Sequence, residues 1–315
     1  MNTKIAVLIA TYNGEKYIKE LLDSLKMQTE KDFCCYIHDD GSSDATMEIL
    51  SKYKNNNDLN ITILDYPPTG SAKANFISLL NYINEPYAMF CDQDDIWECR
   101  KIEVLLNQIE LMEKEHGSDC PIMIFSDLKV VDESLHVIDE SFMHFTGKDP
   151  YQTKVNNLLV TNVIPGCSSI MNRSLYELAG KCSNIDNIMM HDHYVALIAS
   201  CDGLIDYCST PLILYRQHNN NQLGAEQKIG TVDRMRIIWN LVKKGTYVNG
   251  IKEWHSAIRL QAGEVANVIE NKGDNYYLCK EFSMIGERDK ITRVRFIKGN
   301  HISKGKNGWW FLLWC

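Results

Sequence analysis

Four short apolar runs alternate with amphipathic helical patterns over about the first hundred residues, and this alternation most limits what the chain can fold into. The runs are residues 5–10, 33–37, 60–64 and 87–91. The first is a continuous apolar run whose length is typical of a parallel strand covered on both faces, and the other three are also expected to be strands. Strands that alternate with helices form βαβ units with right-handed crossovers. The sequence therefore predicts an α/β fold, with a mostly parallel central sheet flanked by helices.

Polar clusters follow three of these four runs. TYNGE comes after the first run, HDDGSSD after the second and CDQDD after the fourth. Because the carboxyl ends of parallel strands meet at one edge of a sheet, where ligands bind in such folds, we expect one shared site there. Further polar clusters follow in the less regular middle of the chain, in residues 165–172, 189–199 and 215–224.

Asp92, Asp94 and Asp95 stand directly behind the fourth run. Counted as an EF-hand from Asp92, the loop would place Trp97 at the sixth position, where the turn needs glycine, so that type of calcium site is excluded. A solvated turn would not bury Ile96 and Trp97 immediately afterwards. Clustered carboxylates repel one another and are better tolerated when a cation neutralises them. The cluster therefore favours a divalent metal site.

The cluster HDDGSSD has two interpretations. Asp-Gly-Ser is common turn chemistry, and a structural turn explains an isolated copy. At a strand end, however, the carboxylate of Asp39 or Asp40 can accept a hydrogen bond from a nucleobase N–H. Ser42 or Ser43 is then expected to cap the next helix.

These stretches resemble a known family. VLIATYNGEKYIKELLDSLKMQT, IHDDGSSDAT and FCDQDDIW resemble the N-terminal half of family 2 glycosyltransferases with the GT-A fold. GCSSIMNRSL, HDHYVALIA and YRQHNNNQLG resemble the rhamnosyltransferase-like branch, which builds bacterial surface polysaccharides. The resemblance, over roughly residues 4–225, implies a GT-A domain in 1–225, with a nucleotide-sugar half (about 1–98) and an acceptor half (about 99–225). Helical patterns around 235–242 and 254–269 predict a helical C-terminal region over 226–315.

The resemblance also implies roles for single residues. The base and ribose of a nucleotide-sugar donor would be held by Thr11, Tyr12, Glu15 and either Asp39 or Asp40. CDQD supplies the family's D-x-D element, so Asp94 would coordinate Mg²⁺ or Mn²⁺ on the donor diphosphate. Asp92 and Gln93 would face the ribose and sugar, with Asp92 as a second candidate metal ligand.

Asp192, in HDHY, takes the place of the family's general base. The family more often has Glu-Asp there, whereas this chain has His191 before Asp192. Inverting transfer needs an acceptor hydroxyl that is deprotonated as it attacks, and a cation that neutralises the leaving diphosphate. Because Asp192 precedes an apolar run that predicts a buried helix, the helix dipole is expected to lower its pKa. His191 is expected to orient Asp192 or to contact the acceptor.

Three other groups have open alternatives. Arg216 and His218 are expected near the diphosphate or sugar, unless YRQHNNN is only a polar loop. Lys73 and Asn75 could touch the donor, although a helix start explains them nearly as well. GCSS is either a buried strand or part of the lining of an acceptor cleft.

The combined features predict an inverting, metal-dependent glycosyltransferase that extends a surface polysaccharide or lipid-linked glycan. The first candidate donor is dTDP-rhamnose, and a UDP-hexose or UDP-galactose is the second. A nucleotidyltransferase would also need a metal and nucleotide site, but it usually carries an early basic, glycine-rich phosphate loop, and ATYNGEKY is not one. A non-catalytic nucleotide-sugar-binding module is disfavoured because both Asp94 and Asp192 are present.

Composition limits which binding partners and which cellular compartment are expected. The formal net charge is -8 and no dense basic run occurs before the C-terminal region, so we expect no broad nucleic-acid footprint. The cysteines are odd in number and lack C-x-x-C spacing, which favours reduced, buried thiols over disulfides or zinc. With no signal peptide or membrane span in the sequence, we expect a cytoplasmic protein. Residues 286–306 carry a net charge of about +5 and precede GWWFLLWC, which predicts either a packed final helix or peripheral association with an anionic membrane.

Overall fold

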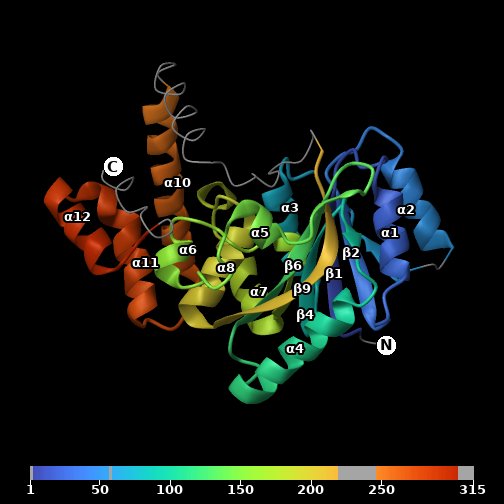
Figure 1. The fold of residues 1–315 in the computed structure, drawn as a ribbon, viewed down its shortest axis with the longest axis horizontal. Coiled ribbons are helices and arrows are strands. Elements are labelled where there is room, and N and C mark those ends of the chain that lie inside the picture. Colours follow the sequence, from blue (N-terminus) through green and yellow to red (C-terminus); the bar gives the residue numbers. More distant parts are fainter. Residues whose placement is uncertain (1–2, 57–58, 219–245, 304–315) are drawn as a thin grey trace.

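The computed structural model describes residues 3–56, 59–218 and 246–303. In these residues, nine strands form a single mixed sheet with helices against it (Figure 1). The order of the main path is β3-β2-β1-β4-β8-β6-β9-β5, and β7 pairs with β6 outside this path. The predicted α/β fold with a mostly parallel sheet in its N-terminal half is confirmed.

The N-terminal half is the predicted series of βαβ units. Its elements are β1 (Ile5–Thr11), α1 (Ile18–Lys26), β2 (Phe33–Asp39), α2 (Thr46–Asn55), β3 (Ile61–Ile63), α3 (Ala72–Leu79), the 3-10 turn η1 (Leu80–Tyr82) and β4 (Tyr87–Asp92). Strands β3, β2, β1 and β4 are all parallel. The register pairs Thr11 with Asp39 and Ala10 with Asp92, so the carboxyl ends of β1, β2 and β4 are level.

The second half adds antiparallel pairing. Its elements are β5 (Ile96–Trp97), α4 (Lys101–His116), β6 (Ile122–Val131), β7 (Val137–Asp139), α5 (Phe142–Thr146), α6 (Val155–Leu158), η2 (Gly166–Ser168), β8 (Ser169–Asn172), α7 (Arg173–Gly180), η3 (Ile185–Asn187), α8 (His191–Asp202) and β9 (Leu204–Arg216). Strand β8 runs antiparallel between β4 and β6, whereas β9 runs parallel to β6 and antiparallel to β5. This order brings the end of β9 towards the turn that follows β4.

The core follows from the apolar periodicity. In β1, Ile5 to Ile9 are all 0% exposed, as a strand covered on both faces requires. Helix α1 buries one stripe, which includes Ile18, Leu21 and Leu25. Ten cysteines lie in the described residues as free thiols, and five of them are buried, whereas Cys99 is exposed, so the prediction of buried thiols holds only in part.

One local prediction was wrong. Neither Ser42 nor Ser43 caps helix α2, whose N-cap residue is Ala45. Asp44 instead accepts a hydrogen bond from the backbone N–H of Thr46 (3.0 Å). The helix begins later than the serines because their side chains bond to Asp39 and Asn13.

Three helices form the described part of the C-terminal region: α10 (Thr246–Val268), α11 (Asp274–Met284) and, after the turn η4 (Ile285–Glu287), α12 (Lys290–Gly299). Helix α10 packs against α11, α8 and η3, and the three helices lie at one end of the molecule (Figure 1). The predicted helix at 254–269 is thus confirmed within α10, whereas the helix at 235–242 and the boundary near 225 lie outside the described residues. None of the described helices has the length and apolar content needed to cross a bilayer.

Candidate functional site

The polar clusters after β1, β2 and β4 meet at one edge of the sheet, as predicted. The Thr11 hydroxyl donates to Asp39 Oδ1 (2.8 Å) across the β1–β2 pair. Gln93 pairs with the backbone of Tyr12, accepting from its N–H and donating to its C=O (both 3.0 Å). A side chain at Gly14 would place Cβ 2.3 Å from Gln93 Oε1, so glycine is required there for this pairing.

The carboxylates predicted to hold the nucleotide also shape the loops of this edge. Asp39 Oδ2 accepts the N–H of Ser42 (2.7 Å), and Asp40 accepts the hydroxyl of Thr69 (3.0 Å). Glu15 Oε2 accepts the N–H of Ala45 just before α2 (2.9 Å). These hydrogen bonds fix the loops around Tyr12, whose side chain is 58% exposed.

The turn after β4 is joined to the end of β9. Asp94 Oδ2 lies 2.8 Å from His218 Nε2, and the His218 ring stacks on Tyr17 at a centroid distance of 4.8 Å. Arg216 is 3% exposed and donates from Nε to the carbonyl of Asp94 (3.1 Å) and from Nη1 to the carbonyl of Glu133 (2.8 Å). Arg216 and His218 therefore lie beside the turn that follows β4, and their predicted contact with a diphosphate or sugar stays a prediction.

Asp92 and Asp95 converge with Cys167 from η2, their ligand atoms all within 4.8 Å of one another. Burial, together with the charges of Asp94 and Asp192, raises the pKa of Asp92 to about 7. Burial raises the pKa of Asp95 well above its ordinary value, and its Oδ2 has no hydrogen-bond partner among the described residues. Such crowded, unsatisfied carboxylates fit a nearby cation.

Lys101, at the start of α4, is a neighbour of this cluster that the sequence analysis missed. It is 0% exposed, donates from Nζ to the carbonyl of Cys167 (2.6 Å) and lies 3.1 Å from the centroid of the Trp97 ring. Burial lowers its pKa to about 7. Its place in the sequence, directly after an acidic cluster and a buried tryptophan, is the signal that could have identified it.

His191, the first residue of α8, is buried between aromatic rings. Its ring lies 4.2 Å from the centroid of Phe76 and 4.7 Å from that of Phe90. Neither ring nitrogen has a hydrogen-bond partner among the described residues, and burial lowers the pKa to about 3. His191 therefore makes no hydrogen bond to Asp192 among the described residues, and its expected role in orienting Asp192 or contacting the acceptor stays a prediction.

Asp192 lies at the N-terminus of α8, where the carboxylate accepts the backbone N–H of His193 (2.6 Å). Its pKa was expected to fall below the ordinary value, and that prediction was wrong. Burial raises the pKa to about 6, because the loss of hydration outweighs the hydrogen bonds that favour the charged form. A carboxyl group with this pKa is ionised at neutral pH and can still accept a proton.

The GCSS stretch is a 3-10 turn that leads into β8, and it packs against the start of α8. A Cβ atom on Gly166 would lie 2.9 Å from both Asp192 Cβ and His191 Nε2. Glycine is thus needed for this close approach. The Asp192 carboxyl faces the same turn that brings Cys167 to the aspartate cluster.

The start of α3 is explained by helix capping. Ser71 is the N-cap residue, and its side chain accepts the N–H of Ala74 (3.3 Å). Asn75 is 1% exposed and bonds to His38. Lys73 donates to the carbonyl of Ile188 (2.7 Å), so it contacts the main chain just before α8.

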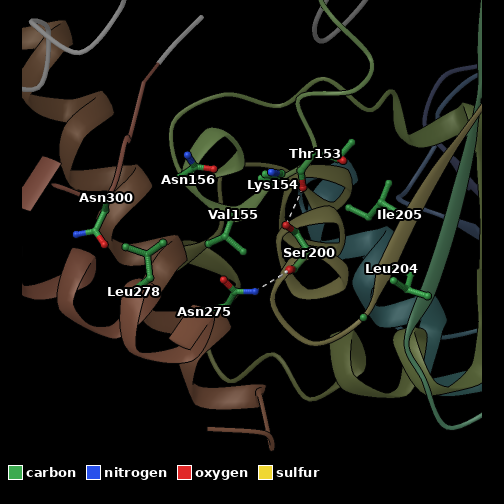
Figure 2. Close-up of a pocket in the computed structure, with 11 residues that line it drawn as sticks. Thr153, Lys154, Val155, Asn156, Ser200, Leu204, Ile205, Asn275, Leu278 and Asn300 are labelled. Carbon is green, nitrogen blue, oxygen red and sulfur yellow. Dashed lines mark hydrogen bonds between the residues drawn. The ribbon is translucent and has the colours of Figure 1, made fainter. Parts of the chain in front are cut away.

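A separate cavity of about 370 Å³ lies between the start of β9, the end of α8 and the C-terminal helices (Figure 2). Ser200 and Asn275 line it, with Ser200 Oγ bonded to the carbonyl of Thr153 (2.7 Å). None of the predicted site residues lines this cavity.

Comparison with known proteins identifies a family and a fold. The family described as Glycosyl transferase family 2 matches residues 6–178. The dTDP-rhamnosyl transferase RfbG of Shigella flexneri is 30% identical over 228 residues, which span 69% of this chain and 74% of RfbG. The poly(ribitol-phosphate) beta-N-acetylglucosaminyltransferase TarS of Staphylococcus aureus (strain Mu50) is 37% identical over 94 residues, which span 29% of this chain and 16% of TarS.

Among solved structures, the crystal structure of S. aureus TarS 1-349 in complex with UDP-GlcNAc has a similar fold. The TM-score is 0.57 at 17% identity, over 94% of this chain and 79% of that one. This chain therefore belongs to glycosyl transferase family 2 and has a GT-A fold.

Proposed function

We propose that the chain is an inverting, metal-dependent glycosyltransferase that moves a sugar from a nucleotide-sugar donor to a hydroxyl of a surface polysaccharide or lipid-linked glycan. The observation that carries this proposal is the meeting of the Asp94–His218 pair and Asp192 at one edge of the sheet. Asp192 lies close enough to the aspartate turn for its charge to raise the pKa of Asp92. One edge of the sheet thus holds a candidate cation site and a candidate base.

Asp192 is the proposed general base. With a pKa of about 6 it is mostly ionised at pH 7, and it is basic enough to take a proton from an attacking hydroxyl. The neutral His191 beside it is held between Phe76 and Phe90, so its proposed part is to form an apolar wall of the site. Enclosure of the base by this wall and by Gly166 raises its proton affinity.

The carboxylate and imidazole groups at the turn after β4 suit Mg²⁺ or Mn²⁺ as ligands. Both ions favour carboxylate oxygens, and Mn²⁺ also accepts an imidazole nitrogen. Asp94 and His218 would hold the ion, with Asp92 close enough for the charge of Asp94 to raise its pKa. A bound cation would neutralise charge on the leaving diphosphate. Arg216 holds the backbone of Asp94 in place, and its guanidinium also pairs with Glu20.

The nucleotide is proposed to bind over the loops after β1 and β2. The exposed Tyr12 ring offers a stacking face for the base. The pocket for the base and ribose would be contacted or shaped by Thr11, Glu15, Asp39 and Asp40. Gln93 would position Tyr12 through its two hydrogen bonds to the Tyr12 backbone. Lys73 is bonded to the main chain at Ile188, so we assign it to the wall of the site.

For the donor, dTDP-rhamnose is the first choice because the similarity to RfbG extends over most of both chains. A UDP-sugar is the alternative, supported by the shorter similarity to TarS. The two donors differ in both base and sugar, so binding of each nucleotide alone separates them.

The C-terminal region is proposed to associate with the anionic inner face of a bacterial membrane, where lipid-linked acceptors would be met. Helix α12 exposes Lys290, Arg295 and Lys298, and beside them Ile291 is 65% exposed. Basic and apolar side chains on one short helix favour an anionic lipid surface. The sequence GWWFLLWC, on which the membrane hypothesis also rested, lies outside the described residues.

A thermal-shift panel tests the proposal. Purified protein is melted with dTDP-rhamnose, UDP-galactose or UDP-GlcNAc, each with Mn²⁺ or with EDTA, and product is sought with the stabilising donor. A ligand at about 100 times its Kd stabilises the fold by about 2.7 kcal/mol. We expect a shift with one donor that needs the metal, followed by transfer or slow hydrolysis. Stabilisation that is equal in EDTA, or no shift with any nucleotide sugar, would contradict the proposal.

A further inference from the structure

The chain reaches the proposed base through a segment with little regular structure. Residues 183–189 contain only the short turn η3 before α8 begins at His191. Backbone N–H groups in such a segment need partners from elsewhere. Two side chains of helix α10, far along the chain, supply several of them.

Glu264 is the first of these side chains and is 1% exposed. Its Oε1 accepts the Ser183 hydroxyl (2.7 Å) and the N–H groups of Ser183 and Asn184, and its Oε2 accepts the side-chain amide of Asn187 (3.2 Å). Burial opposes its ionisation, but the hydrogen bonds from Ser183, Asn187 and Asn184 outweigh burial and lower its pKa. Glu264 is thus an ionised acceptor beneath the turn.

Gln261 is the second side chain and is 0% exposed. It lies one helical turn before Glu264 on α10, and its Oε1 accepts the N–H of Met189 (2.8 Å). Met189 stands two residues before His191, so this bond fixes the main chain where α8 starts.

Helix α3 holds the same segment through Lys73, which donates to the carbonyl of Ile188 (2.7 Å). The donor and acceptor groups of adjacent residues, Ile188 and Met189, are therefore held by different helices. Asp192 follows within one helical turn and packs closely against Gly166, where a Cβ atom would lie 2.9 Å from Asp192 Cβ. The position of the carboxyl is set by these contacts.

We propose that Gln261 and Glu264 are positioning residues for glycosyl transfer, which hold the start of α8 so that Asp192 meets the acceptor hydroxyl. The inference rests on the proposed function of Asp192 as the base. A displacement of about 1 Å at a reacting group can cost roughly 100-fold in rate. Packing of α10 on the domain is already supplied by buried apolar residues such as Ile258, Ala262 and Val265. Gln261 and Glu264 add hydrogen bonds that fix the direction of the main chain in residues 183–189.

The test compares Gln261→Leu, Glu264→Leu and Glu264→Gln with the wild type. Glu253→Gln is the matched control, because Glu253 is an exposed glutamate on the same helix. The readouts are kcat and donor KM, the melting temperature, and amide hydrogen exchange over residues 183–190. Full-length protein is used throughout, and rates are measured well below each melting temperature.

The leucine variants are expected to lose roughly 10- to 100-fold in kcat, with donor KM changed less than about twofold. Glu264→Gln should lose less, because it keeps one acceptor oxygen for Ser183 and Asn184. Exchange of the Ser183 and Met189 amides should accelerate in the variants that remove their acceptors. The control should match the wild type in every readout.

Faster exchange with unchanged kcat would overturn the positioning role and leave only a structural one. A rise in donor KM with unchanged kcat would overturn it as well, because the donor pocket would then be the part affected. Unchanged exchange in both leucine variants would show that α10 does not hold the segment. A wild-type protein that neither transfers nor hydrolyses any nucleotide sugar would refute the proposed function itself, whatever the exchange result.

Discussion

Replacement of Asp192 by asparagine is expected to abolish most turnover and to stabilise the folded protein. Burial raises the carboxyl pKa from an ordinary value of 3.8 to about 6. At 1.36 kcal/mol per pH unit, this difference corresponds to up to about 3 kcal/mol of destabilisation at pH 7, where the group is ionised. Asparagine carries no charge, is close in size, and keeps an oxygen for the N–H of His193 (2.6 Å).

The sign of the pH dependence follows from the raised pKa. In the folded state the Asp192 carboxyl resists ionisation, so its ionised form lowers the free energy of unfolding. This destabilisation is fully present above about pH 6. It disappears below about pH 4, where the carboxyl is protonated in both the folded and the unfolded protein. A gain of about 3 kcal/mol should raise the melting temperature of Asp192→Asn by roughly 5 °C at pH 7. The melting temperatures of variant and wild type should converge as the pH falls towards 4.

The assay combines melting curves between pH 4 and 8 with steady-state turnover at pH 7. Loss of a general base lowers the rate by about 10²–10⁴-fold. Asp274→Asn is the control, because Asp274 is an exposed aspartate in the first turn of α11 and shares the helix-end environment without the burial. A variant that is less stable than wild type at pH 7, or a difference that persists at pH 4, would refute the reasoning on burial. Near wild-type turnover would refute the assignment of the base.

Four further outcomes are expected. In wild-type protein, kcat should fall as the pH drops through about 6, because Asp192 must be ionised to accept a proton; a flat profile from pH 5 to 7 speaks against it as the base. Asp94→Ala should lose the Mn²⁺-dependent part of the nucleotide-sugar thermal shift, and a retained metal effect would exclude Asp94 as a ligand. Gly166→Ala should cost about 1–3 kcal/mol in urea unfolding and lower turnover, because its Cβ would lie 2.9 Å from the Asp192 side chain; unchanged stability would contradict this packing. Arg295→Glu combined with Lys298→Glu should weaken sedimentation with anionic vesicles but not neutral ones, more strongly at low salt, and equal binding would remove the basis for membrane association.

Local sequence patterns determined the N-terminal half of the fold. Strands β1 to β4 lie where they were predicted. For β1, β2 and β4 the reason is that a strand covered on both faces needs a nearly continuous run of apolar residues whatever its partners are. The polar clusters met at one edge because parallel strands share the direction of their carboxyl ends. The family could also be inferred from these clusters, and the comparisons confirm it.

Only the tertiary structure decided how the site is assembled. The pairing of Asp94 with His218 joins residues 124 positions apart. The bond from Met189 to Gln261 joins the segment before α8 to helix α10, 72 positions further along the chain. No local pattern encodes such contacts. The pKa of Asp192 shows the physical reason most directly. The helix end that favours its charge is visible in the sequence, whereas the enclosure that outweighs it depends on segments brought together by folding.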